Sequence, residues 1–582
     1  MNSLHSALFA KNSKRQISNA TWENAKSQSS KIQKSLRPRR ADFWRFPFRV
    51  LIALIIGHWS LVIPAQLSAA TFDLATASIV DINAAFDAGA LTSEKLIQLY
   101  LARIKAYDNA GPHLHTVITL NPNALAEAKA LDAERKAKGP RSPVHGIPVV
   151  AKDNYDTFDL QTSAGSFLLE GSIPPQDATM IKKLRGAGAI ILAKVNLAEF
   201  ASGGSGGTPQ GFSSLGGQTL NPHDLARGPG GSSGGTGSAL AAWFAPLGLG
   251  TDTGGSIRNP CSFNGVPGIK PTNGLLSRAG IVPLSLSFDT GGPMARNIYD
   301  VAVALGIMTG VDPRDPLTST QAGLAYTDYT PFLKKDALKG ARIGVVRDFL
   351  GQDPAVDKIF DQAVAELRAS GAVVVDPIHY PEFVLKGKAS IMSAMRNTEF
   401  REQIREYLAT LKPGYPKNLT EMIAKANALK EPTGHIAPNP GRFAAFKEEN
   451  TGPAPTSLAY RAAKEHGMPL IREAVLGMFE QYQLDALVYP TTPMPAPLIT
   501  ESIKVPAGSA TSLTNIANLT NFPDVIVPAG VTAGKLPVTL SFFGPAFSEP
   551  KLLAYAYAYE QATHHRVAPA STPPLPGEKF DY

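Results

Sequence analysis

Cysteine is almost absent from this chain: Cys261 is the only one among 582 residues. A single cysteine cannot close an intramolecular disulfide, and a cysteine-based metal site cannot be built. The eleven histidines include no His-Glu-x-x-His pair, the zinc motif of many metalloproteases. The sequence therefore predicts an activity without metal or cofactor, and it predicts that Cys261 is a buried structural residue.

Three glycine-containing signatures do not occur in the context that their function requires. The chain has no Gly-Lys-Ser/Thr ending of a phosphate loop, no Gly-x-Gly-x-x-Gly after an expected strand, and no Gly-x-Ser-x-Gly directly after an expected strand, although that spacing occurs at residues 203–207, 230–234 and 231–235. These absences argue against a P-loop nucleotide hydrolase, a dinucleotide-binding enzyme and an α/β-hydrolase.

The body of the chain also lacks excess charge, although the net charge of the whole is +8. Residues 1–49 hold eleven Lys and Arg against Glu23 and Asp42, a net of +9, which leaves −1 for all that follows. A nucleic-acid-binding protein needs a basic surface on its folded part. We therefore expect no nucleic-acid partner.

An uncharged apolar segment at residues 50–70 follows the basic leader at residues 1–49. A positive flank, a short apolar stretch and small residues at its end are typical of a secretory signal peptide. A retained anchor, in contact with a membrane, and a buried helix are the alternatives. The sequence thus predicts export to the periplasm or beyond, or attachment to a membrane.

From residue 71 onward, helical and strand patterns alternate. Helical patterns cover residues 94–107, 125–138, 178–186, 354–369, 389–411 and 551–562, and strand patterns cover 147–151, 189–194, 341–346, 372–375, 484–489 and 523–528. Short apolar strands between helices indicate an α/β sheet covered on both faces. We expect one domain over residues 71–582, with a helical insertion or cap at 381–470.

Two serines in glycine-rich segments indicate the kind of chemistry. Ser232 lies in Gly-Gly-Ser-Ser-Gly-Gly, Ser256 lies in Gly-Thr-Asp-Thr-Gly-Gly-Ser-Ile-Arg, and Lys152 follows the expected strand at 147–151. A nucleophilic serine needs a base and an oxyanion hole, and these segments supply both without a histidine. A flexible linker is the alternative for residues 203–237, but apolar blocks flank them on both sides.

The same segments resemble the amidase signature family over about residues 75–565. The resemblance rests on Pro143-Val-His-Gly-Ile-Pro-Val-Val-Ala-Lys-Asp-Asn, Ala193-Lys-Val-Asn-Leu-Ala-Glu-Phe, Pro229-Gly-Gly-Ser-Ser-Gly-Gly, Leu249-Gly-Thr-Asp-Thr-Gly-Gly-Ser-Ile-Arg-Asn-Pro and Gly265-Val-Pro-Gly-Ile-Lys-Pro-Thr. Two more segments, beginning at Gly211 and at Phe288, are most similar to bacterial peptide amidases. The resemblance implies an α/β fold with a mixed, twisted central β-sheet wrapped by helices.

The resemblance also implies roles for single residues. Ser256 is the expected nucleophile, Lys152 the base, and Ser232 the serine between them, held in a cis peptide. The oxyanion is expected at backbone N–H groups from Thr253 through Gly254 and Gly255 to Ser256.

Four further residues have weaker claims. Ser233 is expected to donate a supporting hydrogen bond, and Asp252 and Arg258 are expected to be structural rather than catalytic. Ser205 either lines the substrate channel or shapes a turn.

The predicted function is hydrolysis of a carboxamide, through an acyl-enzyme, to a carboxylate and ammonia or an amine. The expected substrates are peptide amides or other small or acyl amides, and the expected assembly is a monomer or homodimer. The alternatives are the glutamine-hydrolysing component of a tRNA-dependent amidotransferase and an inactive binding module.

Overall fold

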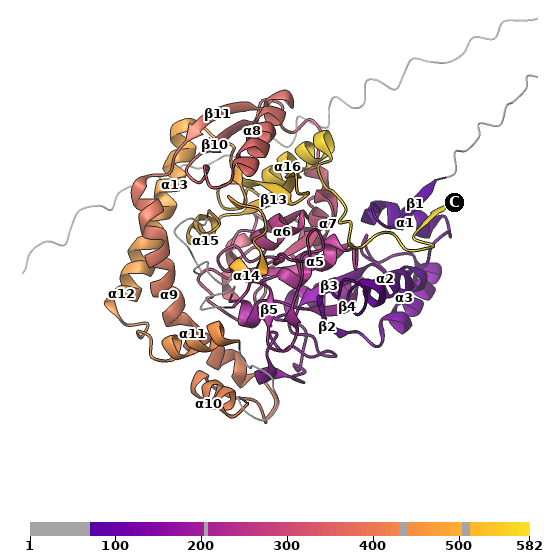
Figure 1. Ribbon diagram of the computed structural model, residues 1–582, viewed down its shortest axis with the longest axis horizontal. Helices are drawn as coiled ribbons and strands as arrows, with labels where there is room; N and C mark the ends of the chain where they lie inside the picture. Colours follow the sequence, from indigo (N-terminus) through magenta and orange to yellow (C-terminus); the bar gives the residue numbers. More distant parts are fainter. Residues whose placement is uncertain (1–69, 203–207, 430–438, 503–512) are drawn as a thin grey trace, which may run out of the picture. The chain divides into compact units, whose positions relative to one another are not determined.

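The computed structural model describes residues 70–202, 208–429, 439–502 and 513–582 (Figure 1). The leader at 1–49, nearly all of the apolar segment at 50–70, and Ser205 lie outside these residues. Within them, no helix combines the length and the apolar character that crossing a membrane requires. The same ranges contain no group of three His, Cys, Asp or Glu side chains arranged to hold a metal ion.

A mixed sheet of eleven strands forms the centre of the fold, in the order β11-β10-β12-β14-β13-β8-β9-β7-β3-β4-β2. The strands are β2 (Val117–Leu120), β3 (Pro148–Lys152), β4 (Ile190–Val195), β7 (Leu247–Asp252), β8 (Gly268–Lys270), β9 (Thr290–Ala295), β10 (Arg342–Val346), β11 (Val373–Ile378), β12 (Ala486–Pro490), β13 (Asp524–Val531) and β14 (Pro537–Phe543). Strand β3 is parallel to β4 and β7, whereas β9 runs antiparallel to β7. The predicted mixed α/β sheet is confirmed.

Helices cover both faces of this sheet (Figure 1). They are α1 (Ile79–Asp87), α2 (Ser93–Tyr107), α3 (Ala124–Lys138), α4 (Thr179–Gly186), α5 (Gly234–Ala241), α6 (Arg258–Asn264), α7 (Ile298–Met308), α8 (Pro354–Ala369), α9 (Glu382–Ala409), α10 (Leu419–Leu429), α11 (Pro440–Asn450), α12 (Leu458–Arg461), α13 (Met468–Tyr482), α14 (Ile499–Ser502), α15 (Asn515–Thr520) and α16 (Glu549–Thr563).

Strand β7 shows how the two faces differ. Leu247 and Leu249 belong to the large hydrophobic core that also contains side chains of α4, α7 and α16. Gly248 points the opposite way, because successive residues of a strand alternate between faces. A Cβ atom at Gly248 would lie 2.6 Å from Thr236 in α5, so the glycine allows α5 to approach the strand closely.

Capping residues explain where the predicted helices begin. The Thr92 hydroxyl accepts a hydrogen bond from the Lys95 N–H at 3.1 Å, and α2 starts after it. Asp353 accepts from two N–H groups of α8, whose first residue is Pro354. Both caps fill hydrogen-bonding positions that a helix start leaves open.

Candidate active site

Lys152 is the last residue of β3 and is fully buried. Its Nζ lies 2.7 Å from the Ser232 Oγ and 2.7 Å from the Thr251 Oγ1. Burial lowers the pKa of Lys152 from 10.5 to about 7, against the opposing effect of the Asp252 and Asp289 carboxylates. At and above about pH 7 much of the Lys152 population is therefore a neutral amine, the form that can accept a proton from Ser232.

Ser232 and Ser233 come immediately before α5. The Gly231–Ser232 peptide is cis, and the Ser232 carbonyl accepts the Ala198 N–H at 2.9 Å. The Ser233 N–H donates to the Ser256 carbonyl at 3.1 Å, and the Ser233 hydroxyl lies 3.3 Å from the backbone of Thr251. The structure therefore brings the two serine segments together at the end of β7.

The loop from Thr253 to Ile257, which we call the serine loop, follows β7 and carries Ser256. The Asp252 carboxylate accepts the Gly255 N–H at 2.8 Å and the Ile257 N–H at 3.0 Å. Within the described residues, the N–H groups of Thr253, Gly254 and Ser256 have no hydrogen-bond acceptor. Three unpaired donors thus remain around Ser256, which is half-buried, whereas Lys152 and Ser232 are fully buried.

Arg258 fixes Asp252 in the core. Its guanidinium contacts Asp252 at 3.0 Å and Asp524 at 3.1 Å, and it also donates to the Thr514 carbonyl and the Asn518 side chain. Burial by itself raises the pKa of Asp252, but the positive charge of Arg258 outweighs this effect and holds the pKa of Asp252 well below its usual range. These contacts support the predicted structural role of both residues.

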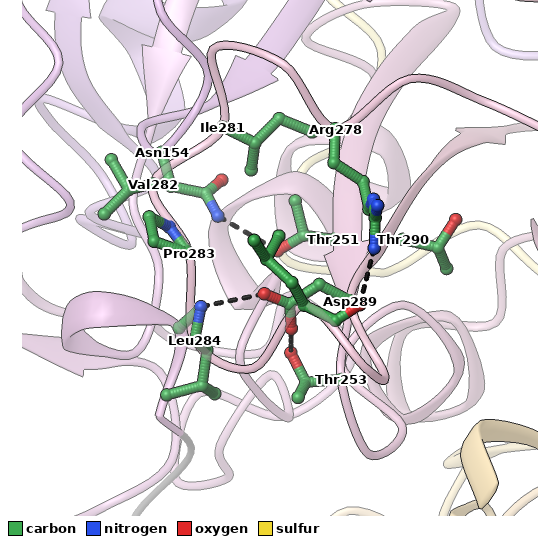
Figure 2. Close-up of a pocket in the computed structure, with 12 residues that line it drawn as sticks. Asn154, Thr251, Thr253, Arg278, Ile281, Val282, Pro283, Leu284, Asp289 and Thr290 are labelled. Carbon is green, nitrogen blue, oxygen red and sulfur yellow. Dashed lines mark hydrogen bonds between the residues drawn. The ribbon is translucent and has the colours of Figure 1, made fainter. Parts of the chain in front are cut away.

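Three residues of this site have no role in the sequence-based prediction. Thr251 contacts Lys152, and the Asn154 side-chain amide donates to the Thr251 hydroxyl at 3.1 Å. Asp289 accepts a hydrogen bond from the Thr253 hydroxyl. Figure 2 shows all of these except Lys152 around a small pocket. The pocket is also lined by five apolar residues of the segment that precedes Asp289: Ile281, Val282, Pro283, Leu284 and Leu286.

Helix α9, in the region expected to be an insertion or cap, contacts this site. A Cβ atom on Gly254 would lie 3.3 Å from the Met392 methyl group, so Met392 packs over the serine loop. One turn later, the Arg396 guanidinium donates to the Ser202 hydroxyl at 3.1 Å. Glu399 accepts from the hydroxyls of Ser285 and Ser287, in the apolar segment that lines the pocket. This helix therefore shapes one side of the site.

Cys261 is fully buried in α6, and burial raises the pKa of its thiol well above the ordinary value. A thiol in this state is a poor nucleophile. It contributes to the apolar contacts between α6 and the sheet, as expected.

Comparisons with known proteins identify the family of this chain. A family model described as Amidase matches residues 95–553. A probable amidase of Arabidopsis thaliana is 35% identical over 505 residues, 86% of this chain and 92% of the plant protein. A glutamyl-tRNA(Gln) amidotransferase subunit of Symbiobacterium thermophilum is 36% identical over 512 residues, 85% of this chain and 99% of the bacterial protein.

Solved structures give a similar result. The peptide amidase PAM, in complex with the competitive inhibitor chymostatin, is 39% identical, with a TM-score of 0.79, over 85% of this chain and 99% of that one. The native peptide amidase of Stenotrophomonas maltophilia is also 39% identical, with a TM-score of 0.78, over 85% of this chain and 98% of its own.

Proposed function

Because this chain belongs to the amidase family, hydrolases of carbon–nitrogen bonds in amides, we propose that it cleaves a carboxamide through Ser256, Ser232 and Lys152. The products are a carboxylate and ammonia or an amine. The observation that carries the proposal is the 2.7 Å contact between Ser232 and a fully buried Lys152.

The reaction begins with a proton transfer along the triad. Neutral Lys152 accepts the proton of the Ser232 hydroxyl, which in turn accepts that of Ser256. The Ser256 Oγ then forms a bond to the amide carbon, and the carbonyl oxygen becomes an oxyanion. The free N–H groups of Thr253, Gly254 and Ser256 are the donors for it, and losing one such donor typically costs about 3–4 kcal/mol.

The tetrahedral intermediate collapses when the carbon–nitrogen bond breaks. The departing nitrogen takes a proton from Ser232, which recovers one from Lys152, and the acyl group remains as an ester on Ser256. A water molecule attacks this ester and gives its proton to the same relay. The bond between the acyl carbon and the Ser256 Oγ then breaks, Ser256 recovers a proton through Ser232, and the carboxylate leaves with all three residues in their starting states.

Peptide amides are the first choice of substrate. The support is the 39% identity with two solved peptide amidase structures, each matched over 85% of this chain.

The test is the release of ammonia from a panel of peptide, acyl and aryl amides by the purified full-length protein, without ATP, metal or partner. Ser256→Ala is expected to lower kcat by about a thousandfold or more, because the nucleophile is lost. Ser238→Ala is the matched control, since this buried serine of α5 donates to the Leu220 carbonyl and makes no hydrogen bond with Lys152, Ser232 or Ser256 among the residues that the structure describes. Activity retained in Ser256→Ala would refute the mechanism.

Glutamine hydrolysis for a tRNA-dependent amidotransferase is the second candidate. It is favoured by the 36% identity with the glutamyl-tRNA(Gln) amidotransferase protein over 99% of that protein's length. Activity that appears only with glutamine, tRNA and partner proteins would support it over the first proposal.

The apolar segment at residues 50–70 carries a separate proposal, that the protein is exported or anchored in a membrane. Fractionation of producing cells, with mass spectrometry of the mature N-terminus, distinguishes a cleaved signal from a retained anchor.

A further inference from the structure

Asp289 is a buried carboxylate that lies immediately before β9 and faces the serine loop. It accepts hydrogen bonds from the Thr253 hydroxyl and from the N–H groups of Leu284 at 2.8 Å and Ser285 at 2.9 Å. Figure 2 shows it between Thr253 and Leu284. Burial raises the pKa of Asp289 above its ordinary value, and these hydrogen bonds oppose the rise. Three donors converging on one carboxylate stabilise its ionised form.

The Thr253 contact holds a part of the loop that Asp252 does not reach. Asp252 binds the N–H groups of Gly255 and Ile257, in the second half of the loop. In the first half, Thr253 is held through its side chain by Asp289, and the Gly254 carbonyl accepts the Thr514 hydroxyl at 2.9 Å. The free N–H groups of Thr253 and Gly254 therefore depend on these two side-chain contacts for their direction.

Asp289 is also the less compensated of two negative charges that act on Lys152. The other, Asp252, is paired with Arg258 at 3.0 Å. Among the described residues, Asp289 has no ion pair: Arg278, the nearby cation, is bonded to Asp315 at 2.6 Å, and Arg396 contacts Ser202. On β4, which pairs with the Lys152 strand β3, Lys194 is paired with Asp153 at 3.1 Å and so adds little net charge near Lys152.

We propose that Asp289 is a positioning residue for amide hydrolysis, which aims the Thr253 and Gly254 N–H groups at the oxyanion and adds a negative charge to the pocket that it lines together with Thr251, the residue that contacts Lys152. The inference rests on the proposed function, because it concerns the same triad.

The charge has a chemical purpose. Burial alone lowers the pKa of Lys152, and the carboxylates of Asp252 and Asp289 oppose it. A lysine with a still lower pKa would be a weaker base, whereas a base with a pKa near the working pH both takes and returns a proton efficiently. Asp289 therefore keeps Lys152 basic enough to accept the proton of Ser232.

Asp289→Asn tests both parts, because the amide keeps the shape of the side chain and removes its charge. We expect the acid limb of the pH profile of kcat/KM to move to lower pH by about one unit, the usual size for loss of a nearby charge. We also expect kcat to fall by about tenfold to a hundredfold, as for slightly misplaced catalytic groups, with KM changed less than about threefold.

Thr253→Val separates the two effects. It removes the hydroxyl that Asp289 binds but leaves the carboxylate, so kcat falls while the acid limb stays in place, and Thr253→Ser restores kcat. Asp300→Asn is the matched control: this buried carboxylate accepts the Ile79 N–H at 3.0 Å, in a different part of the fold. It is expected to change stability but not the pH profile.

An Asp289→Asn variant with the kcat and the acid limb of the wild type overturns the inference. If that variant does not fold, Thr253→Val decides, and wild-type kcat in Thr253→Val is equally contradictory. A wild-type protein that hydrolyses no amide defeats the proposed function itself, and the inference with it. If the inference alone fails, the wild type hydrolyses amides and both Asp289→Asn and Thr253→Val keep its kcat and its pH profile.

Discussion

Replacing Lys152 with methionine is expected to abolish hydrolysis and to stabilise the fold at neutral pH. Burial lowers the pKa of Lys152 from 10.5 to about 7, while the unfolded chain keeps the ordinary value. Between these pH values the unfolded state binds a proton that the folded state lacks. Wild-type stability therefore rises with pH across the window, and the penalty for burying Lys152 is largest at and below about pH 7.

The magnitude follows from the difference between the two pKa values at about 1.4 kcal/mol per unit. Lys152 thus lowers the free energy of unfolding by about 4 kcal/mol at pH 7 and by about 2 kcal/mol near pH 9. Methionine avoids this penalty but loses hydrogen bonds to Ser232 and Thr251, at about 1 kcal/mol each. The expected net gain is about 2 kcal/mol at pH 7 and about zero near pH 9.

Denaturant-induced unfolding of both proteins at the two pH values measures this difference. The control is Lys194→Met, since Lys194 is equally buried but paired with Asp153 at 3.1 Å. Removing that lysine leaves a buried carboxylate unpaired and is expected to cost about 3–5 kcal/mol. A Lys152→Met variant that is less stable than the wild type at pH 7 would contradict the reasoning.

Three further outcomes are expected. The wild-type kcat/KM falls as the pH drops through about 7, because Lys152 becomes protonated, and a profile that is flat to about pH 5 would exclude lysine as the base. Arg258→Met, followed by chemical unfolding, loses about 3–5 kcal/mol because two buried carboxylates lose their partner, and an unchanged midpoint would be inconsistent with this. Gly248→Ala loses about 1–3 kcal/mol because its Cβ meets Thr236, whereas Gly477→Ala, with open space around its Cβ, is expected to lose nothing.

Helices with strong local signals can be predicted almost to the residue. The predicted helix at 354–369 coincides with α8, because Asp353 and Pro354 mark its start. Helix α9 begins at Glu382, seven residues before the predicted start. Gly387 lies in that stretch, and glycine weakens an isolated helix by about 1 kcal/mol. Burial of the Val384 side chain offsets this, and such packing cannot be read from local periodicity.

Lys152, Ser232 and Ser256 can be selected from the sequence because they match family motifs, and the structure brings the segments that carry them together. Asp289 cannot be selected as a site residue from the sequence, although it lies in a segment that resembles peptide amidases. It reaches Thr253 only because β9 pairs antiparallel with β7, which places Thr290 opposite Asp252. Strand order depends on tertiary packing, so a sequence pattern alone assigns no role to Asp289.

The carboxylates of Asp252 and Asp289 hold different parts of the serine loop. Asp252 binds the Gly255 and Ile257 N–H groups, and its charge is compensated by Arg258. Because those two donors are occupied, the N–H groups of this loop that find no acceptor among the described residues are those of Thr253, Gly254 and Ser256, and these three remain for the proposed oxyanion. Asp289 instead binds a side chain of the loop, so it holds the loop without using any of these donors. A backbone contact in its place would have occupied a donor that the proposed reaction uses to stabilise the oxyanion.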